Sequence, residues 1–368
     1  MKIALDAYQA ARPHGGIARY VRGLATAMFK QGNEHEYVLF SNRFREAVEE
    51  WNPALDRVST CTLPAPRRIM QALWNTFSWP AVERWTGEID IFHGMHFVLP
   101  AAKKAKCVLT VHDLTYLRHP EFFFDSNLNE RGYRKELPHA LQRADAVIAV
   151  SENTKRDLVE LMDFPTERIR VIHEGVEPHF FVHAAASQQE QVLARYRLKQ
   201  PYMIFLVGTP EPRKNLERTV RAAQRAAPDV PVAIVGPESD IRLLLGPMAR
   251  YVHFLGSVPD ADLPLLLHHA EISLYPSLYE GFGLPILESM AAGVPVITSN
   301  ISSCPEVVGD VGVLVDPCDE EEISEAISDL ARDEARKTRM REAGVKRAVT
   351  FSWQRAADEV LQLYDEVC

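Results

Sequence analysis

Cysteine is scarce in this sequence and is not arranged as a disulfide framework or a zinc site would require. Five cysteines occur in 368 residues, an odd number, and no two of them form a Cys-x-x-Cys pair. They are scattered along the chain as Cys61, Cys107, Cys304, Cys318 and Cys368. A disulfide-stapled fold and a cysteine-rich metal site are both disfavoured, and we expect a reducing, cytoplasmic environment.

Long apolar runs are lacking too. No segment of 18 apolar residues is present, and the apolar run in residues 1–6 is too short for a signal peptide, so no membrane span or leader is expected. A formal net charge of −9 disfavours a general nucleic-acid surface. Gly15 and Gly16 are not part of a G-x-G-x-x-G run, so the dinucleotide fingerprint is absent. The composition and length fit a soluble protein of two domains.

Strand and helix patterns alternate through both halves of the chain. This alternation predicts the α/β class, with two Rossmann-like, doubly wound domains facing each other across a cleft and ligands at the carboxyl ends of both sheets. The predicted strands cover residues 3–5, 37–40, 89–92, 108–111, 146–150, 169–172, 202–207, 232–235, 252–255, 272–275 and 294–297. The rhythm breaks at residues 177–200, which we interpret as the linker region, so the N-terminal domain is predicted over residues 1–180 and the C-terminal domain over 197–351.

The stretch Y-P-S-L-Y-E-G-F-G-L-P-I-L-E-S-M-A-A-G-V-P-V-I-T-S-N, residues 275–300, is the most informative. Its pattern predicts a strand, a glycine loop, a helix with Pro285 in the first turn and Gly293 as a left-handed C-terminal cap, and a second strand. Backbone N–H groups at such a helix start bind phosphate well.

Two glutamates accompany this loop. A carboxylate beside a phosphate site is costly unless it binds something else, and ionised Glu280 and Glu288 suit sugar or ribose hydroxyls. The alternative is a helix-start charge at Glu288 and a plain turn at residues 281–283.

Basic residues follow another predicted strand in G-T-P-E-P-R-K-N, residues 208–215. Arg213 and Lys214 would lie at the carboxyl edge of the sheet, where a guanidinium and an ammonium group suit a diphosphate. The alternatives are a solvated surface pair and, for Asn215, a helix cap.

Histidines end two strands of the first half. His112 and Asp113 follow residues 108–111, and His112 is either a ligand for a sugar or phosphate oxygen or a satisfied structural histidine. His173 and Glu174 end another strand and could line the same cleft.

These motifs together resemble retaining glycosyltransferase family 4, which has the GT-B fold. The resemblance rests on E-G-F-G-L-P-x-L-E-x-M-A-x-G-x-P-V, G-T-x-E-P-R-K-N, the loop Gly15-Gly16 with Arg19-Tyr20, V-H-D at 111–113 and V-S-E-N-T-K at 150–155, and it spans most of the chain. The wording G-G-I-A-R-Y and G-T-P-E-P-R-K-N-L is most similar to bacterial mannosyl- and rhamnosyltransferases of polysaccharide assembly.

The resemblance implies a role for each matching residue. Arg213 and Lys214 would bind the donor diphosphate, Glu280 the donor-sugar hydroxyls, and Glu288 the ribose. The remaining implied contacts are the backbone of Gly281, Phe282, Gly283 and Leu284 with sugar and phosphate, Gly15 and Gly16 with the phosphates, and His112, with Asp113 beside it, at the sugar and reacting centre.

The implied reaction moves a hexose, mannose from GDP-mannose in the first instance, to a saccharide or lipid-linked saccharide, with retention of configuration and no metal or other cofactor.

Asp260 and Asp262 form a D-x-D, the metal motif of another glycosyltransferase architecture, but a helix N-cap with a first-turn acid explains them. The last helix, about residues 352–368, would pack back on the first domain. The pair His173-Glu174 departs from the Asn-Gly-Val common in relatives.

Two other readings of the fold stay open: a sugar-phosphate synthase or phosphorylase, and a nucleotide-sugar-binding protein without turnover. A glycosidase using Glu280 and Glu288 is disfavoured because hydrolysis needs no phosphate site.

Aromatic and basic residues cluster after position 66. Arg67, Arg68, Trp74, Phe77, Trp79 and Trp85 form either a surface that meets the inner face of the membrane or a packed helix of the first domain. Residues 121–124 pose the same choice.

Overall fold

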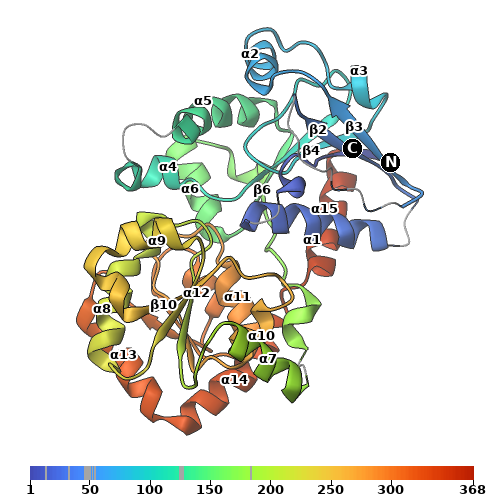
Figure 1. The fold of residues 1–368 in the computed structure, drawn as a ribbon. Coiled ribbons are helices and arrows are strands. Elements are labelled where there is room, and N and C mark those ends of the chain that lie inside the picture. The colour runs from blue at the N-terminus through green and yellow to red at the C-terminus, as the bar shows by residue number, and fades with distance from the viewer. Residues whose placement is uncertain are drawn as a thin grey trace. The chain divides into compact units, whose positions relative to one another are not determined.

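The computed structural model describes residues 1–12, 15–31, 34–44, 51, 53, 55–123, 128–182 and 185–368. The chain divides into two compact units, unit 1 with Met1–Gly175 and Trp353–Cys368, and unit 2 with Val176–Ser352 (Figure 1). Each unit is a parallel sheet covered by helices, which is the predicted Rossmann-like class.

Unit 1 contains a seven-stranded sheet in the order β3-β2-β1-β4-β5-β6-β7, in which neighbouring strands are parallel. Its strands are β1 (Lys2–Asp6), β2 (Glu36–Asn42), β3 (Val58–Leu63), β4 (Ile91–Gly94), β5 (Lys106–Val111), β6 (Ala146–Ala149) and β7 (Ile169–Val171). The central strands are apolar runs buried on both faces, as Ile3, Ala4 and Leu5 show, because helices cover both sides of a parallel sheet.

The helices of unit 1 include the last one of the chain. They are α1 (Gly16–Lys30), α2 (Arg67–Phe77), α3 (Glu83–Thr86), α4 (Thr115–Arg118), α5 (Leu128–Arg143), α6 (Glu152–Met162) and α15 (Trp353–Val367). Figure 1 shows α15 beside α1. Gly23 permits this approach, because a Cβ there would lie 2.3 Å from the Trp353 ring.

Unit 2 contains a six-stranded sheet in the order β10-β9-β8-β11-β12-β13. Its strands are β8 (Met203–Leu206), β9 (Val232–Val235), β10 (Val252–Gly256), β11 (Ile272–Tyr275), β12 (Val296–Ser299) and β13 (Val313–Val315). Its helices are α7 (Ala186–Arg195), α8 (Leu216–Ala226), α9 (Glu238–Leu245), α10 (Leu263–His268), α11 (Leu284–Ala291), α12 (Cys304–Val308), α13 (Glu320–Arg332) and α14 (Glu334–Ala348).

The strand order reverses at one point in each sheet. In unit 1 this point lies between β1 and β4, and in unit 2 between β8 and β11. Loops that leave the carboxyl ends of such strands diverge and form a crevice, which is where doubly wound sheets bind ligands. The loops after β8 and β11 hold Arg213, Lys214 and Glu280, so the fold places these predicted residues where ligand binding is expected.

Two strands and one segment differ from the sequence predictions. β3 and β13, each at one edge of its sheet, were not predicted: β3 reads V-S-T-C-T-L and exposes Ser59, Thr60 and Thr62, and the apolar run V-L-V of β13 is only three residues long. Residues 177–200 include α7, which packs with α10 inside unit 2 and is not a bare linker in the described part. Residues 183–184 lie outside the described residues.

The aromatic cluster around α2 is partly packed and partly exposed. Met70 and Trp74 are buried, whereas the side chains of Ile69, Phe77 and Trp79 are more than half exposed. The packed-helix interpretation therefore holds for Trp74 and not for Phe77 or Trp79. Phe124 lies outside the described residues. In the part of the chain that the structure describes, no helix is both long and apolar enough to cross a membrane.

Candidate active site

The loop after β8 positions Arg213 and Lys214. Gly208 has a positive φ of 62°, and a short 3-10 turn, Pro212–Lys214, ends at Asn215, whose φ is 57°. The Asn215 amide donates to the carbonyl oxygens of Pro276 (2.9 Å) and Pro317 (2.7 Å) and makes no cap hydrogen bond to α8. The predicted helix-cap role of this side chain is therefore wrong, because the amide instead ties the basic loop to the loops after β11 and β13.

The loop after β11 positions Glu280. Its backbone N–H donates to Ser302 Oγ at 2.9 Å, and Ser303 Oγ donates to the carbonyl oxygens of Glu280 (2.9 Å) and Phe282 (2.7 Å). Gly283 begins α11 with a φ of 121°, a conformation that L side chains rarely adopt. Rigid backbone on both sides of Glu280 thus fixes where its carboxylate lies.

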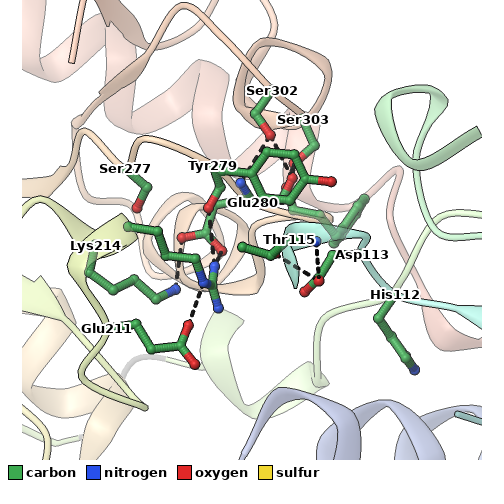
Figure 2. Close-up of polar contacts among 12 residues, drawn as sticks. His112, Asp113, Thr115, Glu211, Lys214, Ser277, Tyr279, Glu280, Ser302 and Ser303 are labelled. Atoms are coloured by element: carbon green, nitrogen blue, oxygen red, sulfur yellow. Dashed lines mark hydrogen bonds and ion pairs between the residues drawn. The ribbon is translucent and has the colours of Figure 1, made fainter. Parts of the chain in front are cut away.

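Arg213, Lys214, Tyr275, Glu280 and Glu211 form one connected group, the Glu280 cluster. Figure 2 shows Glu211, Lys214 and Glu280 of this cluster. Arg213 Nη1 donates to Glu280 Oε2 at 2.6 Å, and Lys214 Nζ donates to Glu280 Oε1 at 2.7 Å. Lys214 Nζ also donates to the Tyr275 hydroxyl at 2.5 Å, and Arg213 Nε pairs with Glu211. The solvated-pair alternative for Arg213 and Lys214 is wrong, because Lys214 is buried and both cations bind one buried carboxylate.

Electrostatics in this cluster favour the ionised glutamate. Burial alone would raise the pKa of Glu280, but the charges of Arg213 and Lys214 outweigh burial and lower this pKa to about 2. Burial and the neighbouring Arg213 charge lower the pKa of Lys214, and Glu280 opposes this effect. At neutral pH the cluster therefore holds an ionised carboxylate between two nitrogen donors.

Helix α11 carries the other predicted residues of this stretch. Gly281 and Phe282 lie in the loop, Gly283 is the N-cap position, and Leu284 opens the helix with Pro285 in the first turn. Glu288 lies one turn further in and is buried, and no acidic residue occupies the first turn, so the helix-start-charge alternative is wrong.

The predicted cap of α11 is also observed. The N–H of Gly293 donates to the carbonyl oxygen of Met290 and that of Val294 to the carbonyl oxygen of Ser289, with φ of Gly293 at 69°. These bonds form a Schellman motif, and the predicted left-handed cap at Gly293 is confirmed.

In unit 1, His112 directly follows β5 and belongs to a second group, the His112 cluster, with Tyr20, Met95 and Glu174. His112 Nδ1 lies 3.1 Å from Glu174 Oε1, and Nε2 lies 3.1 Å from the Met95 carbonyl oxygen. The Tyr20 ring meets the imidazole edge-on at 4.7 Å between centroids. Both ring nitrogens face acceptors, so protein contacts fix the orientation of the imidazole.

The other predicted residues of unit 1 shape its loops. Asp113 Oδ1 accepts from the N–H (3.0 Å) and the hydroxyl (2.8 Å) of Thr115, so this carboxylate supports the start of α4. Gly15, with a φ of 120°, is the N-cap position of α1, and no described atom lies within 4 Å of where its Cβ would be. Gly16 and Tyr20 are four residues apart on α1 and therefore share one face of the helix.

A buried chain of hydrogen bonds holds the Tyr20 hydroxyl in place. This hydroxyl lies 2.9 Å from Thr110 Oγ1, which lies 2.7 Å from His93 Nε2, and His93 Nδ1 lies 2.6 Å from the Tyr364 hydroxyl. Burial, followed by the His112 charge, lowers the pKa of His93 to about 3, so this histidine is neutral. Tyr364 belongs to α15, so the last helix helps to fix the wall of the His112 cluster.

The acidic pair before α10 has a structural explanation. Asp262 Oδ2 accepts from Arg195 Nη1 at 2.6 Å and from the Tyr196 hydroxyl at 3.0 Å, and it makes no side-chain cap bond. The predicted N-cap bond is wrong, since this carboxylate anchors α7 to α10. No group of three or more metal-ligating side chains is found among the described residues.

Sequence reasoning did not single out several residues that form or support these clusters, among them Tyr275, Met95, Glu211, Ser302 and Ser303. Tyr275 is the last residue of β11, and its position at a strand end is a signal that was available. Ser302 and Ser303 lie after β12, and only the fold brings them to Glu280. Glu174 was noted in its loop, but its pairing with His112 spans 62 residues of sequence.

Comparison with known proteins agrees with this architecture. Two family models match the chain: Glycosyltransferase Family 4 over residues 14–180 and Glycosyl transferases group 1 over residues 188–347. The O-antigen chain mannosyltransferase B of Escherichia coli is 33% identical over 284 residues, which are 74% of this chain and 74% of that protein.

Two solved structures share the fold over the whole length. Sucrose-phosphate synthase from Thermosynechococcus elongatus has a TM-score of 0.77 at 22% identity, covering 100% of this chain and 99% of that one. HepE of Anabaena, solved in complex with UDP and glucose, has a TM-score of 0.72 at 19% identity and covers 100% of both chains. The predicted family and fold are confirmed: the chain belongs to the family 4 glycosyltransferases and has the GT-B fold.

Proposed function

We propose that this glycosyltransferase moves mannose from GDP-mannose to a saccharide or lipid-linked saccharide during the assembly of a surface polysaccharide. The observation that carries the proposal is the Glu280 cluster, in which Arg213 and Lys214 converge on one buried carboxylate at the strand-order reversal of unit 2. The choice of mannose rests on the similarity to an O-antigen chain mannosyltransferase.

The chemistry follows from where charge develops in the reaction. When the bond between the sugar and the diphosphate breaks, negative charge accumulates on the leaving phosphate. Arg213 and Lys214 are held in place before the donor arrives, so they stabilise this charge without reorganising in the transition state. Two fixed cations thereby do the work that a divalent ion does elsewhere, and we expect transfer without metal.

Glu280 has two roles in the proposal. Without donor it neutralises the buried cations, which would otherwise be costly to hold. With donor, the cations keep these positions and share their charge with the diphosphate, and the ionised carboxylate accepts hydrogen bonds from the sugar hydroxyls. Glu288, buried on α11, is assigned to the ribose.

His112 is assigned to the donor sugar at the reacting centre. Both of its ring nitrogens already contact acceptors of the protein, so one of these contacts must be replaced when the sugar binds. For His112 to donate to a sugar hydroxyl, substrate has to replace the Met95 carbonyl or Glu174 as a partner. Gly15 and Gly16 are assigned to the phosphates, because the open space beside Gly15 allows a ligand to approach the backbone.

A second candidate is synthesis of a sugar phosphate, with a sugar phosphate as acceptor. The fold-level similarity to sucrose-phosphate synthase is the observation in its favour. We rank it second because likeness at that identity concerns the fold alone.

The test has two steps. A thermal-shift screen over GDP-, UDP-, ADP- and dTDP-linked sugars identifies the donor, since a ligand that binds only the folded state raises the melting temperature. The selected donor is then incubated with oligosaccharides, with sugar phosphates and with inorganic phosphate, and the products are analysed by NMR for linkage and anomeric configuration.

The outcomes separate the candidates. Stabilisation by GDP-mannose and an α-mannosylated oligosaccharide product support the proposal. Transfer only to sugar phosphates or to phosphate would replace it with the second candidate. Donor binding without consumption of the donor, over the whole acceptor panel, would indicate a protein that binds nucleotide sugars without turnover.

A further inference from the structure

A small cavity in unit 1 is built from side chains that the Glu280 and His112 clusters do not use. It lies where β1 and β2 end, because Asp6 and Asn42 are the last residues of these strands, and α2 supplies Arg67 and Trp74. Its volume is about 20 Å³, and a cavity of roughly 10–15 Å³ already admits one water. The cavity therefore admits a group the size of a hydroxyl and no whole sugar ring.

Asn42 is the unusual member of this cavity. Its side chain is only 7% exposed, yet neither Oδ1 nor Nδ2 has a hydrogen-bond partner in the part of the chain that the structure describes. Buried amides are nearly always paired, because an unpaired one loses its bonds to water without replacement. An amide offers one acceptor and one donor group, and a hydroxyl can pair with both.

Charges around the cavity disfavour ionic occupants. Asp6 places a carboxylate against one side, where Oδ1 accepts the Tyr8 N–H at 3.0 Å, and the Arg67 guanidinium stacks on the Tyr8 ring at 4.3 Å. A carboxylate at the wall disfavours a phosphate, and a guanidinium group disfavours a metal cation. A neutral hydroxyl can donate to Asp6 and accept from Arg67, so it satisfies both.

The remaining lining is apolar. Trp74 has its indole N–H satisfied by the Pro80 carbonyl oxygen at 2.9 Å, so only ring carbon faces its surroundings, and Val98 and Pro100 complete the wall. Apolar walls beside a few well-placed hydrogen-bonding groups are typical of small-molecule sites.

His96 lies beside His112, with 6.3 Å between the ring centroids, and feels the charge of Arg67, which lines the cavity. Burial lowers its pKa well below the usual value, and the charges of His112 and Arg67 lower it further, so the ring is neutral. Its Nδ1 is buried and has no hydrogen-bond partner among the described residues. The edge of unit 1 thus holds two polar side chains whose hydrogen-bonding atoms are kept available.

We infer that the cavity bounded by Asp6, Asn42, Arg67 and Trp74 is a specificity subsite that receives one hydroxyl group of the acceptor saccharide. The inference rests on the proposed function, because it assigns a subsite to the acceptor of that reaction. It commits to a neutral sugar hydroxyl and not to the phosphate of a lipid-linked acceptor.

The decisive variant is N42L, which removes both hydrogen-bonding atoms at nearly constant shape. Binding of methyl glycosides of mannose, rhamnose, galactose and N-acetylglucosamine is measured by saturation-transfer NMR, in parallel with inorganic phosphate. We expect at least one glycoside to bind the wild-type protein, phosphate not to compete with it, and N42L to weaken that glycoside about tenfold or more.

The melting temperature is a second readout, and it separates a binding role of Asn42 from a purely structural one. Because the Asn42 amide is unpaired, N42L should melt at or above the wild-type temperature. The matched control is N75L: the Asn75 amide is paired with Glu136 (2.8 Å) and Arg143 (2.6 Å), so this variant should melt lower and bind the glycoside normally. R67M is the second variant and should weaken the same glycoside several-fold.

Several results would overturn the inference: no glycoside binding to the wild-type protein, equal binding to N42L, or phosphate as the preferred occupant. Failure of the proposed function looks different, because the probe needs no donor. If glycoside binding depends on Asn42 while no nucleotide sugar is consumed, the subsite stands and the assigned transfer reaction falls.

Discussion

The Glu280 cluster and the His112 cluster use one buried glutamate each, and the two glutamates are equally buried at 5% exposure. They differ in what the carboxylate faces. Glu280 binds Arg213 and Lys214, an arginine that stays charged at any ordinary pH and a lysine at 2.7 Å, whereas Glu174 binds an imidazole that is charged only when protonated. The first arrangement suits a ligand with a permanent negative charge, and the second suits adjustable hydrogen bonding to a sugar.

The two clusters also differ in how the chain assembles them. Each part of the Glu280 cluster lies within a recognisable motif close to a strand end, and the fold only has to place two adjacent loops together. The His112 cluster takes contributions from α1, the loop after β4, the end of β5 and the loop after β7. A substitution in the Glu280 cluster should therefore affect mainly the contacts of the substituted residue. A substitution in the His112 cluster should act by changing the orientation of the imidazole.

Loss of the lysine charge should have the largest effect. We expect Lys214→Met to lower kcat/KM for transfer by roughly 10²–10³-fold, since it removes a preplaced charge from the leaving diphosphate. Steady-state kinetics with the donor chosen by the thermal-shift screen measures this.

Lys337→Met is the matched control, because Lys337 is a buried lysine of unit 2 that pairs with Glu271 and Glu334 away from the cluster. It should lower the melting temperature and leave the kcat/KM of the folded enzyme intact. Near-normal transfer by Lys214→Met would remove the diphosphate assignment.

Acid should weaken unit 2 through Glu280. The pKa of this carboxyl is about 2 in the folded protein against 4.5 for an ordinary glutamate, so it stabilises the fold above pH 4.5 and the contribution is lost as the pH falls toward 2. The shift corresponds to about 3 kcal/mol. Glu280→Gln should flatten this dependence, measured as the free energy of unfolding in denaturant between pH 6 and pH 2.

Glu306→Gln controls for the general effect of removing a carboxylate from unit 2, since that residue lies in α12 and not in the Glu280 cluster. It should keep the acid dependence of the wild-type protein. An unchanged dependence in Glu280→Gln would mean that the ion pairs with Arg213 and Lys214 do not persist in solution.

Removal of Glu174 should have a smaller effect that acts through His112. In Glu174→Ala the imidazole loses one of its two hydrogen-bond partners and keeps the Met95 carbonyl, so we expect kcat to fall by about 10–100-fold while nucleotide binding by unit 2 is unchanged. Recovery in Glu174→Gln would show that holding the ring matters more than the carboxylate charge.

The control for this prediction is Glu121→Ala. Glu121 contacts His119 at 2.9 Å in the same unit, but that pair is largely exposed and should contribute little. A kcat loss as large in Glu121→Ala as in Glu174→Ala would contradict the positioning role of Glu174.

The same contrast explains what the sequence could and could not predict. Nine of the eleven predicted strands overlap a strand in all or most of their length; the exceptions are residues 89–92 and 294–297, because β4 begins only at Ile91 and β12 only at Val296. Buried strands carry continuous apolar runs, and the helix stop at Gly293 has a specific residue signal, so these could be predicted. β3 has no such run, because Ser59, Thr60 and Thr62 interrupt it, and the apolar run of β13 is only three residues long.

Contacts between side chains were harder to predict from the sequence than helices and strands. The sequence placed Arg213, Lys214 and Glu280 near the same ligand, but nothing in it indicated that the two cations would share that carboxylate. Asn42 gave no signal at all, because an unpaired amide is a property of packing around it. Asn215 and Asp262 followed helix-cap rules by position, yet each side chain found stronger partners on a distant segment.

The smallest expected effect is that of metal removal. Transfer should continue in EDTA at an unchanged rate, because the two basic side chains of the Glu280 cluster are expected to neutralise the diphosphate.

The one acidic motif of metal type, Asp260 and Asp262, has its second carboxylate bound by Arg195 and Tyr196. Asp262→Asn should therefore cost about 1 kcal/mol of stability, through the weakened anchor of α7, and leave kcat unaltered. Chelator-treated enzyme is assayed with and without added Mg²⁺ or Mn²⁺, beside the melting temperature of the variant. The contrary result would be transfer that strictly requires a metal ion and is lost in Asp262→Asn. The Asp262 carboxylate would then have to leave Arg195 and bind a cation, and the permanent charges of the Glu280 cluster would no longer be sufficient to neutralise the diphosphate.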